Sequence, residues 1–125
     1  MKVRIYYHDT DCGGVVYYAN YLRYLEEGRT EFFEQRGVAI KKLAESGTVF
    51  VVARQEIDYK APAYYGDILE INTRLANLSK VRMELDCEVK NQDGKAICVG
   101  KTILACVGSD LKPKGLPEEV RKALQ

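Results

Sequence analysis

Residues 48–107 carry four successive strand patterns with no helical pattern between them, and this feature most constrains the fold. Apolar and polar side chains alternate along residues 69–75 and 81–89, which is the period of a half-buried strand. Residues 97–107 are nearly all apolar, as is typical of a central strand. Residues 91–94, Asn-Gln-Asp-Gly, supply a hairpin turn between two of these strands. Because parallel strands need crossover connections that are usually helical, we expect an antiparallel sheet.

One long helical pattern precedes these strands. Residues 19–36 place apolar side chains on one helical face, and Gly37 follows as a C-terminal cap. Asn20 is the best polar N-cap by residue type, although the turn of the preceding segment would also let the helix begin at Tyr18 or Ala19. At 1.5 Å per residue this helix measures about 27 Å, enough to cross several strands. The remaining elements that we expect are a strand at 3–7, a short helix at 39–45, a strand at 49–59 and a final helix at 117–124.

These elements predict an α+β fold, in which an antiparallel sheet of about five strands wraps around one long helix. The chain has 125 residues, 46% of them hydrophobic and 30% charged, which fits a single domain over residues 1–125. Lys and Arg total 19 against 18 Asp and Glu, so the net charge produces no strong electrostatic field that would attract nucleic acid or anionic membranes. No apolar stretch approaches the roughly 20 residues of a transmembrane helix. We therefore expect a soluble cytoplasmic protein.

The chain offers no ligand set of the kind that binds zinc. Its four cysteines form no Cys-x-x-Cys pair, and His8 is the single histidine. We expect free thiols in a reducing compartment, no metal and no cofactor.

The segment 9–21 combines two carboxylates, a glycine bend and a helix start directly after a short apolar run. A carboxylate can attack or deprotonate, while free N–H groups at a helix start stabilise negative charge on a carbonyl oxygen. We expect an extended chain to turn Asp9 and Asp11 to one side. For Asp9 we favour a structural role, in which its carboxylate caps the turn by accepting backbone N–H groups, as Asp commonly does before glycine-rich bends. For Asp11 we favour a catalytic role. This layout predicts an acyl-transfer site.

The run from Tyr7 to Tyr21, YHDTDCGGVVYYANY, resembles the signature of the hot dog fold acyl-CoA thioesterases of the YbgC-type, 4-hydroxybenzoyl-CoA thioesterase group. The similarity continues through the helix to Phe33, and the later strand order matches along nearly the whole chain. The resemblance implies that Asp11 is the essential carboxylate, as nucleophile or as general base on water. It also implies that the backbone amide of Tyr18 polarises the thioester oxygen.

The chain departs from the pattern of this group at Tyr18, where YbgC-type members often carry His, so no imidazole-assisted step is carried over. His8 precedes the motif and is assigned a surface or packing role. Cys12 stands where the group commonly has Ala or Pro, and we expect no nucleophilic role for it.

The resemblance also implies binding groups for coenzyme A, whose phosphates lie far from the thioester. Lys80 and Arg82 are the candidates at one turn, and Lys112 and Lys114 are candidates near the C-terminus. The tyrosines near the turn at 61–67, namely Tyr59, Tyr64 and Tyr65, are assigned either to an acyl pocket or to a subunit interface.

The resemblance implies a homo-oligomer, dimer or tetramer, with homotetramer as the expected form and sites between subunits. One helix covers only one sheet face, and we expect the other face to be apolar and to need a partner. An acyl carrier protein is a further candidate for the thiol carrier. Two alternatives stay open: a noncatalytic acyl-binding or scaffolding protein of the same fold, and an Asp-nucleophile phosphatase, whose alternating strands and helices the sequence does not favour.

Overall fold

The computed structural model describes all residues, 1–125, and contains one five-stranded sheet in the order β1-β3-β4-β5-β2. Every neighbouring pair of strands is antiparallel, which confirms the predicted sheet. The strands are β1 (Lys2–Arg4), β2 (Thr48–Tyr59), β3 (Ile68–Leu78), β4 (Arg82–Lys90) and β5 (Ala96–Gly108). Because β2 pairs only with β5, its other edge has no partner strand.

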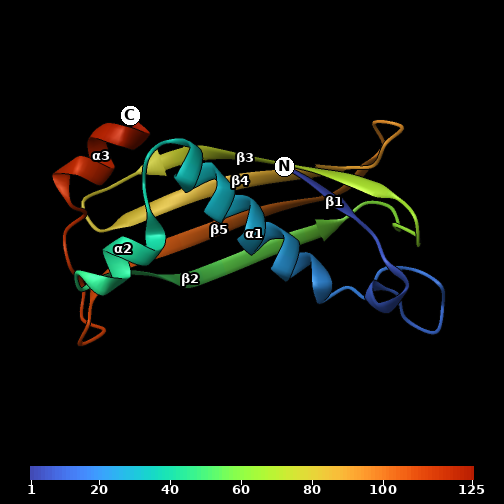
Figure 1. Ribbon diagram of the computed structural model, residues 1–125, viewed down its shortest axis with the longest axis horizontal. Helices are drawn as coiled ribbons and strands as arrows, with labels where there is room; N and C mark the ends of the chain where they lie inside the picture. The colour runs from blue at the N-terminus through green and yellow to red at the C-terminus, as the bar shows by residue number, and fades with distance from the viewer.

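The long helix α1 (Asn20–Gln35) lies across one face of the sheet (Figure 1). Gly28 allows this close approach, because a Cβ atom there would lie 2.7 Å from Cγ2 of Ile71 on β3. The chain leaves the helix through Gly37, whose φ of 78° is a backbone conformation that favours glycine. The amide of Val38 donates to the carbonyl of Phe33 at 2.9 Å, as in a Schellman cap.

Both ends of α1 lie one residue inside the predicted range of 19–36. The predicted N-cap is wrong: Ala19 occupies that position, and Asn20 is the first helical residue. The side-chain amide of Asn20 instead donates to the carbonyl of Asp9 at 2.8 Å. A polar residue suited to capping therefore connects the preceding loop to the helix.

The first strand is shorter than the predicted range of 3–7. β1 ends at Arg4, and the chain then forms the short 3-10 helix η1 (Tyr7–Asp9). The carboxylate of Asp9 accepts a hydrogen bond from the amide of Tyr6 at 2.8 Å, which closes this turn. Alternation over five residues could not reveal the turn, because the bond that closes it comes from Asp9, beyond the strand pattern.

Two short helices close one end of the sheet, α2 (Ile40–Glu45) and α3 (Glu118–Leu124), while the segment between β1 and α1 lies at the other end (Figure 1). Both helices match their predicted ranges to within one residue at the start. Their buried side chains join one core cluster with Phe32, Phe33 and the helix-facing side chains of β4 and β5. No helix has the length and apolar character that a membrane crossing requires.

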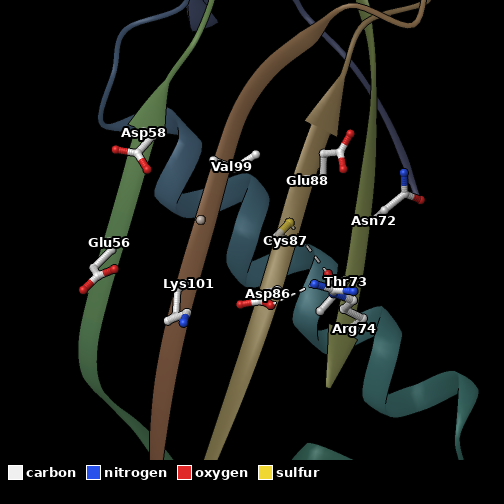
Figure 2. Close-up of a pocket in the computed structure, with 11 residues that line it drawn as sticks. Glu56, Asp58, Asn72, Thr73, Arg74, Asp86, Cys87, Glu88, Val99 and Lys101 are labelled. Carbon is white, nitrogen blue, oxygen red and sulfur yellow. Dashed lines mark hydrogen bonds and ion pairs between the residues drawn. The ribbon is translucent and has the colours of Figure 1, made fainter. Parts of the chain in front are cut away.

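The sheet face opposite α1 carries a hollow of about 470 Å³ across four strands (Figure 2). Its lining is charged rather than apolar. The expectation that the second sheet face is apolar is therefore wrong over this hollow. The charged side chains in it are Glu56, Asp58, Arg74, Asp86, Glu88 and Lys101. Part of this charge is internally paired, since Arg74 bonds to Asp86 at 3.2 Å.

Candidate active site

Residues 9–17 form a short hairpin just before α1. The amide of Tyr17 donates to the carbonyl of Asp9 at 3.0 Å, and the amide of Asp11 donates to the carbonyl of Val15 at 2.9 Å. The turn is closed by the amide of Gly14, which donates to the carbonyl of Asp11 at 3.1 Å. Gly14 has a φ of 80°, so the glycine bend predicted from the sequence is present at this position.

The hairpin is fixed against the turn that follows β2. The amide of Val16 donates to the carbonyl of Ala63 at 2.9 Å, and Val15 forms an isolated antiparallel bridge with Tyr64. Val16 and Ala63 are both buried. Buried contacts on one side therefore leave the tip of the hairpin, residues 11–14, exposed on the other.

Asp9 is the buried carboxylate of the segment, with 2% of its surface exposed. It accepts the amide of Tyr6 and forms an ion pair with Arg23 of α1. Burial raises the pKa of Asp9, but the Tyr6 amide, the neighbouring Tyr24 hydroxyl, the Arg23 guanidinium and the charge of His8 together outweigh it and leave the pKa below its usual 3.8. The turn-capping interpretation of Asp9 is confirmed by its bond to Tyr6.

Asp11 is exposed, so the two carboxylates do not lie on the same side as expected. The reason is the 3-10 turn at Tyr7–Asp9, which rotates Asp9 into the core before the hairpin begins. One oxygen of Asp11, Oδ1, accepts the amide of Gly13 at 2.8 Å. The second oxygen of this exposed side chain accepts no hydrogen bond from the chain.

Tyr18 lies at the junction of the hairpin and α1. Its backbone amide donates no hydrogen bond within the chain, and neither does that of Ala19. The carbonyl of Tyr18 accepts the hydroxyl of Tyr59 at 3.3 Å, and the two rings meet edge to face. An N–H group that points away from the helix start without a partner can stabilise a developing oxyanion. Asp11 and the Tyr18 amide therefore share one end of the molecule.

Lys80 and Arg82 lie at the opposite end of the sheet. β3 begins at Ile68 near the hairpin and ends at Leu78 just before Lys80, a span of about 35 Å at 3.3 Å per residue. One chain thus does not bring these two cations to Asp11. Lys114 lies on this distant end too, where its ammonium donates to Thr48 Oγ1 at 2.7 Å, and Lys112 is exposed.

The three tyrosines near the predicted turn separate in the fold. Tyr59 packs against Tyr18 and Tyr21 at the start of α1, whereas the ring of Tyr65 contacts Tyr7 edge to face. Tyr59, Tyr64 and Tyr65 are all exposed by half or more. They surround the hairpin on two sides and do not form one closed pocket.

The remaining reactive side chains form no second site. Cys87, Cys98 and Cys106 are buried free thiols, and burial raises the pKa of Cys98 to about 12. Cys12 is exposed at the hairpin tip, and the exposed His8 stacks on the ring of Tyr6. No group of three or more His, Cys, Asp or Glu side chains is arranged to hold a metal ion.

Two arginines of α1, Arg23 and Arg29, were not predicted as site residues from the sequence. Arg23 anchors Asp9, while Arg29 is buried beneath the middle of the helix. Arg23 lies on a predicted helix 14 residues after Asp9, so their pairing depends on how the loop folds back. One sequence feature could have identified Arg29: this charged residue interrupts the apolar face of the helix between Leu25 and Phe32.

Comparison with known proteins identifies the class. The model of the thioesterase-like superfamily matches residues 5–124. The acyl-CoA thioester hydrolase YbgC of Escherichia coli O6:H1 is 32% identical over 119 residues, covering 94% of this chain and 89% of that protein. A hypothetical protein, TT1821 from Thermus thermophilus, has the same fold, with a TM-score of 0.94, 30% identity and coverage of 99% and 95%.

A second similar structure, also from Thermus thermophilus, is a thioesterase in complex with coenzyme A and Zn. Its TM-score is 0.85 at 31% identity, with 99% of this chain and 89% of that chain covered. Together with the hairpin, the helix and the sheet order, these matches define the class of protein. The chain belongs to the thioesterase-like superfamily, and its architecture is the hot dog fold.

Proposed function

We propose that the protein is an acyl-CoA thioesterase that hydrolyses a thioester to a free acid and coenzyme A. The observation that carries the proposal is the exposed carboxylate of Asp11 at the same end of the molecule as the unpaired amide of Tyr18. The names of the relatives support the same class of reaction. The reaction needs no cofactor and no metal, because the carboxylate and the amide supply its chemistry.

The amide of Tyr18 donates a hydrogen bond to the thioester oxygen and stabilises the negative charge that develops on it. Asp11 has two roles open to it. As a nucleophile it forms an anhydride with the acyl group and releases the coenzyme A thiolate, and water then cleaves the anhydride. As a general base it takes a proton from the attacking water, and the departing thiolate takes up a proton.

The enzyme acts as a homo-oligomer, dimer or tetramer, in this proposal. The free edge of β2 supports it, because a long unpaired strand edge is a ready surface for a second copy. Lys80 and Arg82, too far from Asp11 in their own chain, would bind the coenzyme A phosphates of a substrate held by a neighbouring subunit. An acyl carrier protein is the alternative thiol carrier.

Thiol release from a panel of short, long and aromatic acyl-CoAs tests the proposed activity. We expect hydrolysis of at least one class well above the rate without protein. Binding of acyl-CoA without release of thiol would favour the noncatalytic acyl-binding alternative. Turnover of acyl carrier protein thioesters alone would identify an acyl carrier protein, in place of coenzyme A, as the thiol carrier of the substrate. The fold argues against the phosphatase alternative, since the consecutive antiparallel strands lack the alternating helices of that class.

A further inference from the structure

A buried positive charge lies beneath the middle of α1. Arg29 has 9% of its surface exposed, and no carboxylate of the chain lies within ion-pair distance of it. Its only hydrogen bond runs from Nη1 to the hydroxyl of Thr102 at 3.3 Å. A guanidinium has five N–H donors, so this one bond leaves most of them without a partner in the chain, and the unpaired nitrogens keep some contact with solvent. The unpaired donors of Arg29 are therefore available to a group from outside the chain.

The polar groups in hydrogen-bond contact with Thr102 beneath Arg29 are neutral and already satisfied. Burial lowers the pKa of Arg29, and the charge of Glu26, three residues earlier on α1, opposes this effect without forming an ion pair. The hydroxyl of Thr102 donates to Oε1 of Gln55 at 2.6 Å, and Nε2 of Gln55 donates to the carbonyls of Glu56 and Lys101, each at 3.1 Å. No member of this network can neutralise the guanidinium. The network instead holds Thr102 with its lone pairs toward Arg29, which fixes the position of the charge.

Arg29 shares a helical stripe with the proposed reaction centre. Leu22, Leu25 and Arg29 follow one another at spacings of three and four residues, which places them along one side of the helix, and Tyr18 lies just before the helix start. This side faces β5 and β2, since Tyr18 contacts Tyr59 and Leu25 lies against Gly100. Leu22, midway along the stripe, is 48% exposed. The stripe is thus apolar between an oxyanion donor and a buried cation.

The spacing of the stripe limits the ligand. Tyr18 and Arg29 are separated by about 16 Å along the helix axis at 1.5 Å per residue. The arginine side chain leans back toward the helix N-terminus, which shortens this gap. A short acyl group bound at the Tyr18 amide cannot reach Arg29, whereas an acyl group of medium length can.

We propose that Arg29 binds a carboxylate at the far end of the acyl group, so that the preferred substrates are ω-carboxyacyl thioesters of medium length. The inference rests on the proposed thioesterase function. The acyl chain lies along Leu22 with its carbonyl at the Tyr18 amide, and its terminal carboxylate takes the unpaired N–H donors of Arg29. A charge-assisted hydrogen bond in a buried site accounts for the selectivity over an apolar chain end.

Suberoyl-CoA and octanoyl-CoA, which have equal carbon number, test this assignment. We expect kcat/KM for suberoyl-CoA to exceed that for octanoyl-CoA by about tenfold or more in the wild type, the scale of one charged hydrogen bond. Arg29→Gln should reduce this ratio by about tenfold, mainly through KM, while Arg29→Lys restores part of it. Arg74→Gln, an exposed arginine on the opposite sheet face, is the matched control and should keep the wild-type ratio.

Several outcomes would overturn the assignment. One is a wild type that prefers octanoyl-CoA. Another is an Arg29→Gln variant that loses activity on both substrates equally, which would indicate a counter-ion from a second copy of the chain. If Arg29→Gln does not fold, the wild-type ratio and Arg29→Lys decide the question. If the wild type hydrolyses no thioester, the proposed function fails, and calorimetric binding of the two acyl-CoAs tests the Arg29 assignment separately.

Discussion

Asp9 holds four groups of the N-terminal segment in place. Its carboxylate accepts the Tyr6 amide and pairs with Arg23, and its carbonyl accepts the Tyr17 amide and the side chain of Asn20. These bonds connect the turn before the hairpin, the end of the hairpin and the first turns of α1. The relative position of the Asp11 tip and the Tyr18 amide therefore depends on a residue that touches neither.

Asp9→Asn should lower both stability and turnover. Asn keeps an acceptor for the Tyr6 amide but loses the charge that pairs with Arg23, and we expect a loss of about 1–3 kcal/mol in the free energy of unfolding. The ion pair contributes the smaller part, because Arg23 is half exposed. Urea denaturation measures this loss, and steady-state kinetics should show a lower kcat with less change in KM.

Asp93→Asn is the matched control for this experiment, since the side chain of Asp93 lies exposed in the turn after β4 and accepts no hydrogen bond. A stability and kcat of Asp9→Asn equal to those of this control would show that the bonds of Asp9 do not hold the site.

The close packing of α1 on β3 depends on a single glycine. Alanine is the better helix former by about 1 kcal/mol, so a free helix would gain from Gly28→Ala. Against the sheet, the new methyl group would lie 2.7 Å from Cγ2 of Ile71 and 3.1 Å from Oγ1 of Thr73. The steric conflict outweighs the helix propensity, because packed interiors yield little to an added atom.

Gly28→Ala should therefore destabilise the protein by about 1–3 kcal/mol in thermal or urea unfolding. The double variant Gly28→Ala with Ile71→Ala should lose less free energy of unfolding than the sum of the losses of the two single variants, because Ile71→Ala removes the clashing methyl group. An increase in stability on Gly28→Ala alone would contradict the close approach of α1 to β3.

The elements that followed from the sequence are those set by local periodicity. The alternation along 69–75 and 81–89 and the helical face of 19–36 fix β3, β4 and α1, because each pattern reports the burial of its own element. The end of β1, the burial of Asp9 and its separation from Asp11 depend on contacts with α1. Arg23 became a functional candidate only once α1 was placed beside the loop. The interruption of the apolar helix face at Arg29 is visible in the sequence, but its hydrogen bond to Thr102 depends on the position of α1 over β5.

At the scale of the whole molecule, the proposed reaction centre and the proposed phosphate-binding cations lie at opposite ends of the sheet. The unpaired edge of β2 runs between those ends and bears Val52, whose side chain is 52% exposed. Pairing of this edge with a second copy would bury that side chain and extend the sheet. It would also enclose the side of α1 that carries Leu22.

Val52→Asp should weaken the oligomer and lower activity together. A charge on a paired edge strand is unfavourable, so light scattering should show a smaller assembly than the wild type. Leu111→Asp changes an exposed apolar side chain in the turn after β5 and should leave the assembly unchanged. An unchanged mass for Val52→Asp, or a monomeric wild type with full activity, would contradict an interface at this edge.

Asp11→Asn offers the most direct test of the proposed mechanism, measured as thiol release on the best acyl-CoA substrate. The amide is nearly the same size and keeps an oxygen for the Gly13 amide, so the hairpin should stay folded while the nucleophile or base is lost. We predict a fall in kcat of about 100-fold or more, with an unchanged unfolding midpoint. Equal rates for Asp11→Asn and the wild type would contradict the assignment of Asp11 as the reacting carboxylate.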